Sequence, residues 1–208
     1  ILIVDDDPAV RSSLALFLET HGLPVRAFEG AEAALAACSP AWQGCAVLDV
    51  KLKGMDGLGL QAELQRRGVT LPVIFLTGHG DIPMTVKAMK AGACEFLTKP
   101  AHGADLLPLI RAALAQDSQA RARDKEDLAQ RERLARLSQR EWEILQLVLA
   151  GHANKDIARI LNISHRTVEV HRSHILAKTG ATSMLELAHI LSRTEPEESA
   201  AAASGSSA

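Results

Sequence analysis

The spacing of apolar residues changes once along this 208-residue chain, at about residue 116, and this change constrains the fold more than any other feature. Before it, short runs of β-branched or apolar residues alternate with longer segments in which apolar residues recur every three to four positions. This alternation is typical of βαβ units that build a parallel sheet. After it, only the helical pattern remains. The sequence therefore predicts an α/β domain followed by an all-α domain.

The first domain, residues 1–116, contains five strand-like runs, each followed by a helix-like segment. We expect strands at residues 2–4, 25–28, 46–48, 73–76 and 95–97, and helices at residues 8–21, 31–37, 57–67, 83–91 and 104–115. Asp7 and Pro8 suit the cap and first residue of a helix, and Gly22 suits its left-handed end. Pro108 is expected in the first turn of the last helix or at a kink. Five strands and five helices predict a doubly wound, five-stranded parallel sheet.

The second part of the chain divides into a linker, a helical domain and a tail. Residues 117–136 lack Gly and Pro and carry opposite charges four positions apart, as at Asp117 and Arg121, which favours a solvent-exposed helical linker. Residues 137–194 contain four helix candidates, at 139–150, 155–161, 165–178 and 184–192. Residues 195–208 have no apolar face, and we expect them to be disordered.

Composition excludes several classes of protein. With 47% hydrophobic and 23% charged residues, the chain has enough apolar material for buried cores. Its longest apolar runs span only a few residues, whereas a membrane-spanning helix needs about 20, so we expect no membrane association. The three cysteines contain no C-x-x-C pair, which argues against a disulfide framework or a zinc site. The first residues do not resemble a signal peptide, and we expect a cytoplasmic protein with reduced thiols.

Polar residues stand directly after the predicted strands. Three aspartates at residues 5–7 follow the first strand, Asp49 the third, Thr77 the fourth and Lys99 the fifth. Ligands of open parallel sheets gather beyond the carboxyl ends of the strands. Clustered carboxylates repel one another unless a hard cation such as Mg²⁺ joins them, and a Lys with a Thr hydroxyl would complete a phosphoryl cradle. An acidic triplet alone is more often a solvated turn or helix cap, so the whole combination carries the prediction.

The sequence around these strand ends resembles the receiver domain of two-component response regulators over residues 1–116. The motifs are Ile3-Val4-Asp5-Asp6-Asp7, Leu48-Asp49-Val50 with Gly54-Met55-Asp56-Gly57, Leu76-Thr77-Gly78-His79-Gly80, and Phe96-Leu97-Thr98-Lys99-Pro100. The resemblance implies a flavodoxin-like fold in which Asp49 accepts a phosphoryl group from a sensor histidine kinase and becomes an acyl phosphate. It also implies that Lys99 pairs with the phosphoryl oxygens, that Thr77 turns inward to hydrogen-bond them, and that Phe96 rotates into the vacated space.

The same resemblance implies a Mg²⁺ site beside the phosphoacceptor. Asp6 and Asp49 would bind the ion directly together with the main-chain carbonyl of Lys51, while Asp5 would act through water.

Three positions depart from the usual receiver pattern. Ala101 stands where an aromatic residue usually follows the Lys-Pro pair, which bears on how the last strand and helix pack. Lys53-Gly54 replaces the Pro-Gly pair that commonly follows the phosphoacceptor, and Lys51 adds a cation two residues past Asp49. We predict that Lys51 alters the lifetime of the phosphoryl group by steering or blocking the attacking water.

The helical domain has the pattern of a helix-turn-helix. Ser138 and Glu141 form a capping-box pattern, and Asn154 and Ser164 are candidate caps of the next two helices. Two short helices joined by a tight turn suit the DNA-binding motif whose second helix enters the major groove. The alternative is a generic helical bundle, and the surplus of only two positive charges over residues 137–194 does not decide against it.

The expected recognition helix, residues 165–178, has one face opposite its apolar positions Val168 and Ile175. The side chains on that face are able to reach base edges, and they are Arg166, Val170, Ser173 and Ala177, with Glu169 and His174 on the flanks. Three cations are better placed to contact phosphates, which position a protein on DNA without reading its sequence: Lys155, Arg172 and Lys178.

Motifs in this domain resemble the LuxR-type DNA-binding domain. They are Leu137-Ser138-Gln139-Arg140-Glu141, Gly151, Asn154-Lys155-Asp156-Ile157-Ala158, and Arg166-Thr167-Val168-Glu169-Val170-His171-Arg172. The two domains together resemble the FixJ/NarL class of regulators, and residues 78–84 favour the FixJ side. The resemblance implies base reading by Glu169, Val170 and Ser173. Glu169 either accepts from a cytosine N4 amine or turns toward a neighbouring Arg.

The sequence therefore predicts a transcription regulator switched by phosphorylation at Asp49, and no enzyme. We expect double-stranded DNA, a sensor histidine kinase and RNA polymerase as partners, with homodimers forming on phosphorylation. At rest the receiver either covers the recognition helix or is held away from it by the linker. One alternative is a Mg²⁺-dependent phosphotransferase with a D-x-D nucleophile. Another is a DNA-binding protein whose receiver serves only as a dimerisation scaffold.

Overall fold

The computed structural model describes residues 1–78 and 92–194, which fall into two compact units divided between residues 122 and 123. The helix expected at residues 83–91, most of the motif at residues 78–84 and the tail at residues 195–208 lie outside the described residues. Each unit is described by itself below.

The first unit contains the predicted five-stranded parallel sheet. Its strands are β1 (Leu2–Val4), β2 (Arg26–Phe28), β3 (Ala46–Asp49), β4 (Val73–Thr77) and β5 (Glu95–Thr98), in the order β2-β1-β3-β4-β5. All four neighbouring pairs are parallel. Since the strand order reverses direction between β1 and β3, their carboxyl ends form the point at which such sheets bind ligands.

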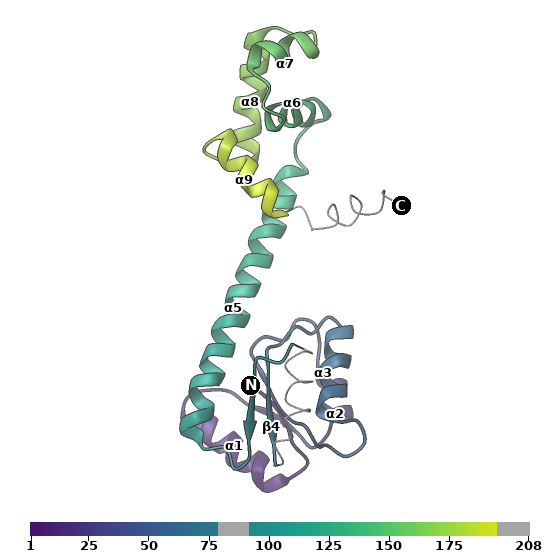
Figure 1. Ribbon diagram of the computed structural model, residues 1–208, viewed down its shortest axis with the longest axis vertical. Helices are drawn as coiled ribbons and strands as arrows, with labels where there is room; N and C mark the ends of the chain where they lie inside the picture. The colour runs from purple at the N-terminus through teal and green to yellow at the C-terminus, as the bar shows by residue number, and fades with distance from the viewer. Residues whose placement is uncertain (79–91, 195–208) are drawn as a thin grey trace, which may run out of the picture. The chain divides into compact units, whose positions relative to one another are not determined.

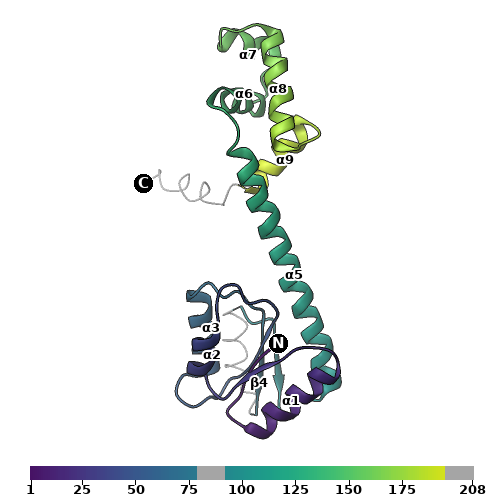
Figure 2. The ribbon, with the colours of Figure 1, turned by 180° about the vertical axis from the view of Figure 1, so that it is seen from behind.

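Helices cover both faces of this sheet, so its central strands are apolar except for the last residues of β3 and β4, Asp49 and Thr77 (Figure 1). Helices α2 (Ala31–Ala37) and α3 (Gly57–Arg66) pack on one face over a core that includes Phe75. Helices α1 (Pro8–Thr20) and α5 (Gly103–Leu134) pack on the other face over a core that includes Ile74 and Ile110. Figure 2 shows α1 and α5 on their common face of the sheet. Two-sided burial explains the unbroken apolar runs of the strands.

Residues beside the strands begin and end the helices as their chemistry predicts. Asp7 caps α1 by accepting a hydrogen bond from the Ala9 amide at 2.8 Å, and Pro8 is the first helical residue. The chain leaves α1 through Gly22, whose φ of 76° is left-handed. These interactions confirm the cap expected at Asp7, and they orient the aspartate triplet relative to β1.

Helix α5 excludes one of the two alternatives for Pro108 and differs from expectation in the burial of its middle part. It runs for 32 residues through Pro108, so this proline lies inside the helix beyond its first turn. It also includes most of the predicted linker, and the start of that linker is not solvent-exposed. Asp117 is only 6% exposed and accepts a hydrogen bond from the Gly44 amide at 2.9 Å, while Arg121 donates both to Asp117 and to the carbonyl of Trp42. Long-range contacts, which charge pattern does not reveal, thus hold this part of α5 against the loop before β3.

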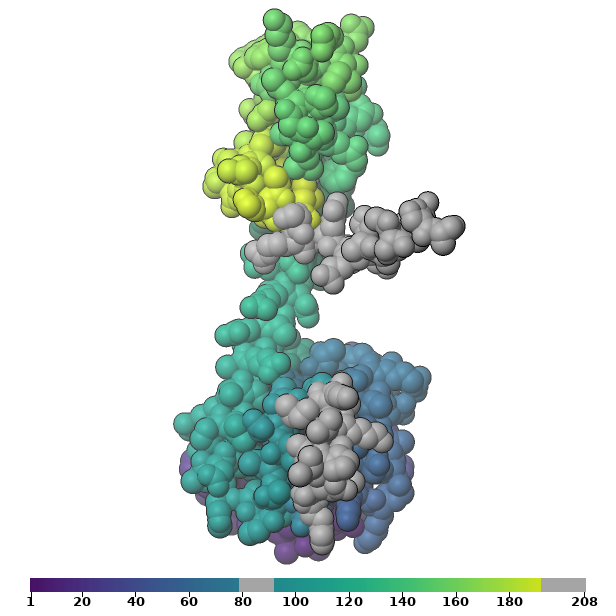
Figure 3. Space-filling view, in the orientation of Figure 1, coloured from purple at the N-terminus to yellow at the C-terminus, as the bar shows by residue number. Residues whose placement is uncertain are grey.

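The second unit is the predicted four-helix domain. Its helices are α6 (Gln139–Leu149), α7 (Asn154–Ile160), α8 (His165–Thr179) and α9 (Met184–Thr194), and Figure 3 shows their atoms as one compact mass coloured green to yellow. The fully buried side chains at its centre are Ile144, Leu145, Ile157, Val168, Ile175 and Leu187. Every helix contributes at least one of them, so the four helices share one core.

The caps of this unit follow the sequence prediction with one exception. Ser138 and Glu141 form the capping box of α6, and Ser164 caps α8 by accepting from the Thr167 amide at 3.0 Å. Asn154 does not cap α7, because the cap position is Ala153 and Asn154 is the first helical residue. The Asn154 amide oxygen instead accepts a hydrogen bond from Arg172 of α8 at 2.7 Å.

The three cysteines are free thiols, as expected. Burial raises the pKa of Cys45 to about 12, so this residue is a protonated core side chain at neutral pH. In the part of the chain that the structure describes, no helix combines the length and the apolar character needed to cross a membrane.

Candidate functional site

The carboxylates that follow β1 and β3 gather in one pocket. Because Val4 pairs with Leu48 across these strands, the residues that come next, Asp5 and Asp49, are neighbours. Asp5 is 1% exposed and Asp49 is 7% exposed. One carboxylate oxygen from each of Asp5, Asp6 and Asp49 lies within 4.8 Å of the others, a spacing that fits a shared cation. The sequence prediction of an acidic cluster at this edge is therefore confirmed.

Lys99, directly after β5, reaches into this cluster. Its Nζ lies 2.6 Å from Asp5 Oδ2 and 2.6 Å from Asp49 Oδ2. Burial by itself lowers the pKa of Lys99, but the hydrogen bonds to Asp49 and Asp5 outweigh it, so the pKa is raised and the ammonium stays charged. Three carboxylates and one ammonium leave two negative charges, the amount that one divalent cation balances.

Backbone amides orient the two buried carboxylates. The other oxygen of Asp49, Oδ1, accepts a hydrogen bond from the Lys51 amide at 3.0 Å, and Oδ1 of Asp5 accepts from the Asp7 amide at 3.0 Å. Arg11 of α1 donates to the main-chain carbonyl of Asp5 at 2.7 Å, a contact that sequence reasoning missed. Both oxygens of Asp49 are thus held in place by hydrogen bonds.

Helix α3 lies directly behind the main chain of Asp49. The Gly57 amide donates to the carbonyl of Val50 at 3.0 Å, and a Cβ placed on Gly57 would lie 2.2 Å from the carbonyl oxygen of Asp49. Only a glycine allows this close approach.

The remaining receiver residues occupy the edge and rim of the pocket. Thr77 is fully buried at the end of β4, and its carbonyl accepts from the Lys99 amide at 2.6 Å. Phe96 is half-buried on β5 and packs against the α2/α3 core. The side chains of Lys51 and Lys53 are exposed, and Lys53 Nζ lies 3.8 Å from Asp6. The structure thus brings Asp5, Asp6, Asp49 and Lys99 together, while Phe96 packs against the apolar core under α2 and α3.

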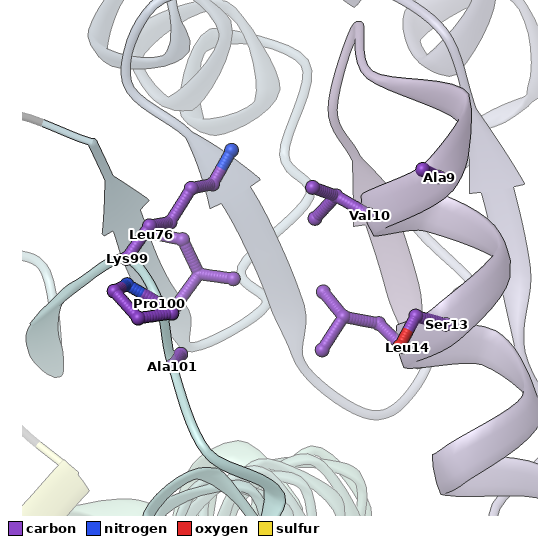
Figure 4. Close-up of a pocket in the computed structure, with 8 residues that line it drawn as sticks. All are labelled: Ala9, Val10, Ser13, Leu14, Leu76, Lys99, Pro100 and Ala101. Atoms are coloured by element: carbon purple, nitrogen blue, oxygen red, sulfur yellow. The ribbon is translucent and has the colours of Figure 1, made fainter.

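A cavity of about 430 Å³ lies between α1 and the segment after β5, beside Lys99 (Figure 4). Val10 and Leu14 face it from α1, Leu76 faces it from β4, and Pro100 and Ala101 face it from the segment after β5. A large side chain at position 101 would project from this wall, so the small Ala101 contributes to the open space. This is the packing consequence of the Ala101 departure.

Helix α8 presents the face expected to read DNA. Val168 and Ile175 are fully buried, whereas Val170 is 40% exposed and the side chain of Arg166 is 85% exposed. Glu169 lies 3.4 Å from Arg166, so its carboxylate is turned toward the neighbouring arginine in this structure. The buried and exposed faces of α8 are those expected from its helical periodicity.

The predicted phosphate-contacting cations differ in their surroundings. Lys155 is exposed, whereas Arg172 donates to Asn154 of α7. Lys178 Nζ lies 2.6 Å from Glu141 Oε2 of α6. Arg172 and Lys178 therefore already link α8 to its neighbouring helices, which sequence spacing did not reveal.

Comparisons with known proteins match both units. Residues 1–111 match the family model "Response regulator receiver domain", and residues 135–191 match "Bacterial regulatory proteins, luxR family". The chain belongs to the two-component response regulators. It joins a receiver to a LuxR-type DNA-binding domain, the combination found in FixJ-like transcription regulators controlled by phosphorylation.

Individual relatives share this combination over nearly their whole length. The transcriptional regulatory protein TdiR of Thauera aromatica is 44% identical over 93% of this chain and 85% of its own. FixJ of Azorhizobium caulinodans is 44% identical over 89% of this chain and 88% of its own. The structure of the response regulator StyR superposes with a TM-score of 0.82 at 39% identity, covering 92% of this chain and 97% of that one.

Proposed function

We propose that Asp49 is the phosphoacceptor of this regulator and that its phosphorylation controls DNA binding by the second unit. The observation that carries the proposal is the pair of 2.6 Å contacts from Lys99 Nζ to Asp5 and Asp49, because they assemble the acidic pocket around one oriented carboxylate.

Phosphoryl transfer from a sensor histidine kinase would proceed by attack of an Asp49 oxygen on phosphorus. The new O–P bond forms as the bond from phosphorus to the donor histidine nitrogen breaks, and the donor imidazole leaves. Asp49 is suited to this attack because hydrogen bonds from Lys99 and the Lys51 amide hold its two oxygens in place. After the transfer, the ammonium of Lys99 would pair with the negatively charged phosphoryl oxygens.

The acidic cluster fits Mg²⁺. Asp6 and Asp49 would hold the ion with the main-chain carbonyl of Lys51, and Asp5 would act through water. When bound, the ion supplies positive charge that stabilises the transferring phosphoryl group. The three carboxylates are close enough for this role, and their net charge with Lys99 matches a divalent ion.

The conformational change caused by phosphorylation would extend from Asp49 to the edge of the sheet. Thr77 would hydrogen-bond the phosphoryl group, and Phe96 on the neighbouring strand would change its packing in response. The altered surface would favour homodimers, and a dimer reads two half-sites of double-stranded DNA with greater affinity than one unit. Recruitment of RNA polymerase would follow binding, and the only covalent chemistry of the chain would be that of its own switch.

On DNA, α8 would enter the major groove. Arg166, Glu169, Val170 and Ser173 would face the bases, and Glu169 would have to leave Arg166 to accept from cytosine. Contacts to phosphates would come from Lys155, Arg172 and Lys178.

The decisive test is the intact mass of the purified chain after incubation with Mg²⁺ and acetyl phosphate, with Asp49→Asn as the matched variant. We expect one phosphoryl group on the wild type and none on the variant, and tighter binding to operator DNA by the phosphorylated protein alone. No adduct on the wild type, under conditions that label a control receiver, would contradict the proposal and favour the scaffold alternative.

Lys51 gives a second, finer test. Its exposed side chain starts two residues past the carboxylate, and we expect Lys51→Ala to change the rate at which the phosphoryl group is lost. Equal rates for wild type and variant would contradict this role.

A further inference from the structure

Helices α6 and α8 bring together two histidines and a glutamate that the proposed function does not use as a group. His171 and His174 stand one turn apart on α8, and Glu141 stands on α6. One ligand atom from each of Glu141, His171 and His174 lies within 4.8 Å of the others. We propose that these three side chains form a binding site for a divalent transition-metal ion, with Zn²⁺ as its best fit.

The donor set suits such an ion. Zn²⁺ takes imidazole nitrogen and carboxylate oxygen in tetrahedral geometry, and sites with three protein ligands leave the fourth position to water. Two nitrogens and one carboxylate oxygen do not suit Mg²⁺ or Ca²⁺, which prefer oxygen ligands throughout. The site would therefore differ in metal preference from the all-carboxylate pocket of the receiver.

The state of His171 points independently to a ligand. Its ring atom Nδ1 is buried and has no hydrogen-bond partner among the described residues. A buried polar atom without a partner costs free energy, and a metal ion bound at Nδ1 would offset this cost. The half-buried ring is held beside α6, so little of its freedom remains to be lost on binding.

Glu141 is a charged ligand held in position. It is 3% exposed, and both the Ser138 amide, at 2.7 Å, and Lys178 Nζ, at 2.6 Å, donate to its Oε2 atom. These bonds leave Oε1 for a cation. They also fix the carboxylate as part of the capping box of α6, so this ligand is oriented before the ion arrives.

His174 completes the site by a small movement. In a tetrahedral zinc site the ligand atoms lie about 3.3 Å apart, given metal–ligand distances of about 2.0 Å. The three atoms, which lie within 4.8 Å of one another, therefore have to approach by at most about 1.5 Å, and the exposed ring of His174 is free to move by rotation. Binding would tie α8 to α6 through a second link beside that of Lys178.

The experiment is a calorimetric titration of the untagged full chain with Zn²⁺ in excess Mg²⁺, which saturates the receiver pocket. The key variant is His174→Gln, since this residue is exposed and its replacement leaves the core intact. The matched control is His165→Gln, which alters an exposed histidine on the same helix outside the cluster. We expect one zinc ion per chain, a loss of affinity of about tenfold or more in His174→Gln, and wild-type affinity in His165→Gln.

Two further measurements separate this site from other zinc-binding groups, such as the free thiols. Co²⁺ should give a visible absorption band with the wild type that His171→Gln and Glu141→Gln both lose, with helix content checked by circular dichroism. Glu141→Gln keeps an oxygen for the capping box while removing the charge. Zinc affinity and cobalt spectrum unchanged in His174→Gln, or a site that the His171→Gln/His174→Gln double variant retains, would overturn the proposal.

Discussion

The acidic pocket of the receiver and the outer face of α8 use charged side chains in opposite ways. In the receiver, Asp5 and Asp49 are buried, and Lys99, whose side chain is 20% exposed, contacts both of them. On α8, Arg166 and Glu169 pair on the open surface within a single helix. Buried charged side chains have a single arrangement in which each one has a partner. Charged side chains on the surface have several arrangements of similar energy.

Because of this difference, substitutions that remove a charge should lower folding stability by different amounts in the two regions. Removing one member of the buried cluster leaves its partners uncompensated, while removing a surface charge exposes the partner to water. The following predictions test that contrast from the largest expected effect to the smallest.

Lys99→Met should destabilise the first unit by about 3 kcal/mol in Mg²⁺-free buffer, because it leaves two buried carboxylates without their cation. Urea unfolding followed by the fluorescence of Trp42, in a Trp142→Phe background, measures this change. Lys53→Met is the matched control, because its ammonium is 87% exposed and contacts Asp6 only at 3.8 Å. Equal unfolding midpoints for the two variants would show that burial does not determine how much folding stability is lost.

Glu141→Gln should destabilise the second unit by about 2 kcal/mol, since the buried carboxylate loses its charged hydrogen bond with Lys178. Urea unfolding followed by Trp142 fluorescence, in a Trp42→Phe background, measures it. Trp42 fluorescence in the Trp142→Phe background should show the wild-type midpoint for the first unit, and a change there would contradict an effect confined to the second unit.

The effect of Glu141 should depend on pH. Burial alone raises its pKa, but hydrogen bonds from Lys178 and Ser138 outweigh this and lower the pKa from 4.5 to about 2. Because the folded-state pKa is the lower one, the carboxylate stabilises the unit fully above about pH 5 and loses this contribution as the pH falls toward 2. The stability difference between wild type and Glu141→Gln should therefore shrink over that range.

Lys155→Ala should weaken DNA binding about threefold at low salt, to the same degree for operator and random DNA, because a phosphate contact does not read sequence. The slope of log affinity against log salt should fall by about 0.9. Fluorescence anisotropy over a salt series measures both quantities. A loss confined to operator DNA would place Lys155 at the bases instead.

Glu63→Gln should leave the urea midpoint of the first unit unchanged. Hydrogen bonds from Arg66 and Arg67 lower the pKa of Glu63 to about 2, as strong a perturbation as that of Glu141, yet the side chains of the two arginines are 72% and 42% exposed. Surface ion pairs contribute little to folding stability because water already solvates both partners. A clear loss of stability would contradict the proposed difference between buried and exposed charges.

The same contrast explains which features the sequence predicts. Asp5 and Asp49 follow strands whose parallel pairing puts their ends side by side, so their proximity follows from the strand pattern alone. Asp117 contacts Gly44, which is 73 residues away, and no local pattern encodes that contact. The cap of α7 was mispredicted at Asn154 because Arg172 of another helix takes its side chain. Periodicity predicts which face of a helix is buried, but not which of several nearby partners a polar side chain selects.

The contact between Gly57 and the main chain of Asp49 also limits how this site can change in evolution. Any side chain at position 57 would collide with the carbonyl oxygen of Asp49, and the collision is with backbone rather than with a side chain that can move aside. Lys51 and Lys53, in contrast, lie on the open rim of the same pocket. Mutations that survive selection should therefore accumulate on the rim, while the backbone contact behind the carboxylate stays unchanged.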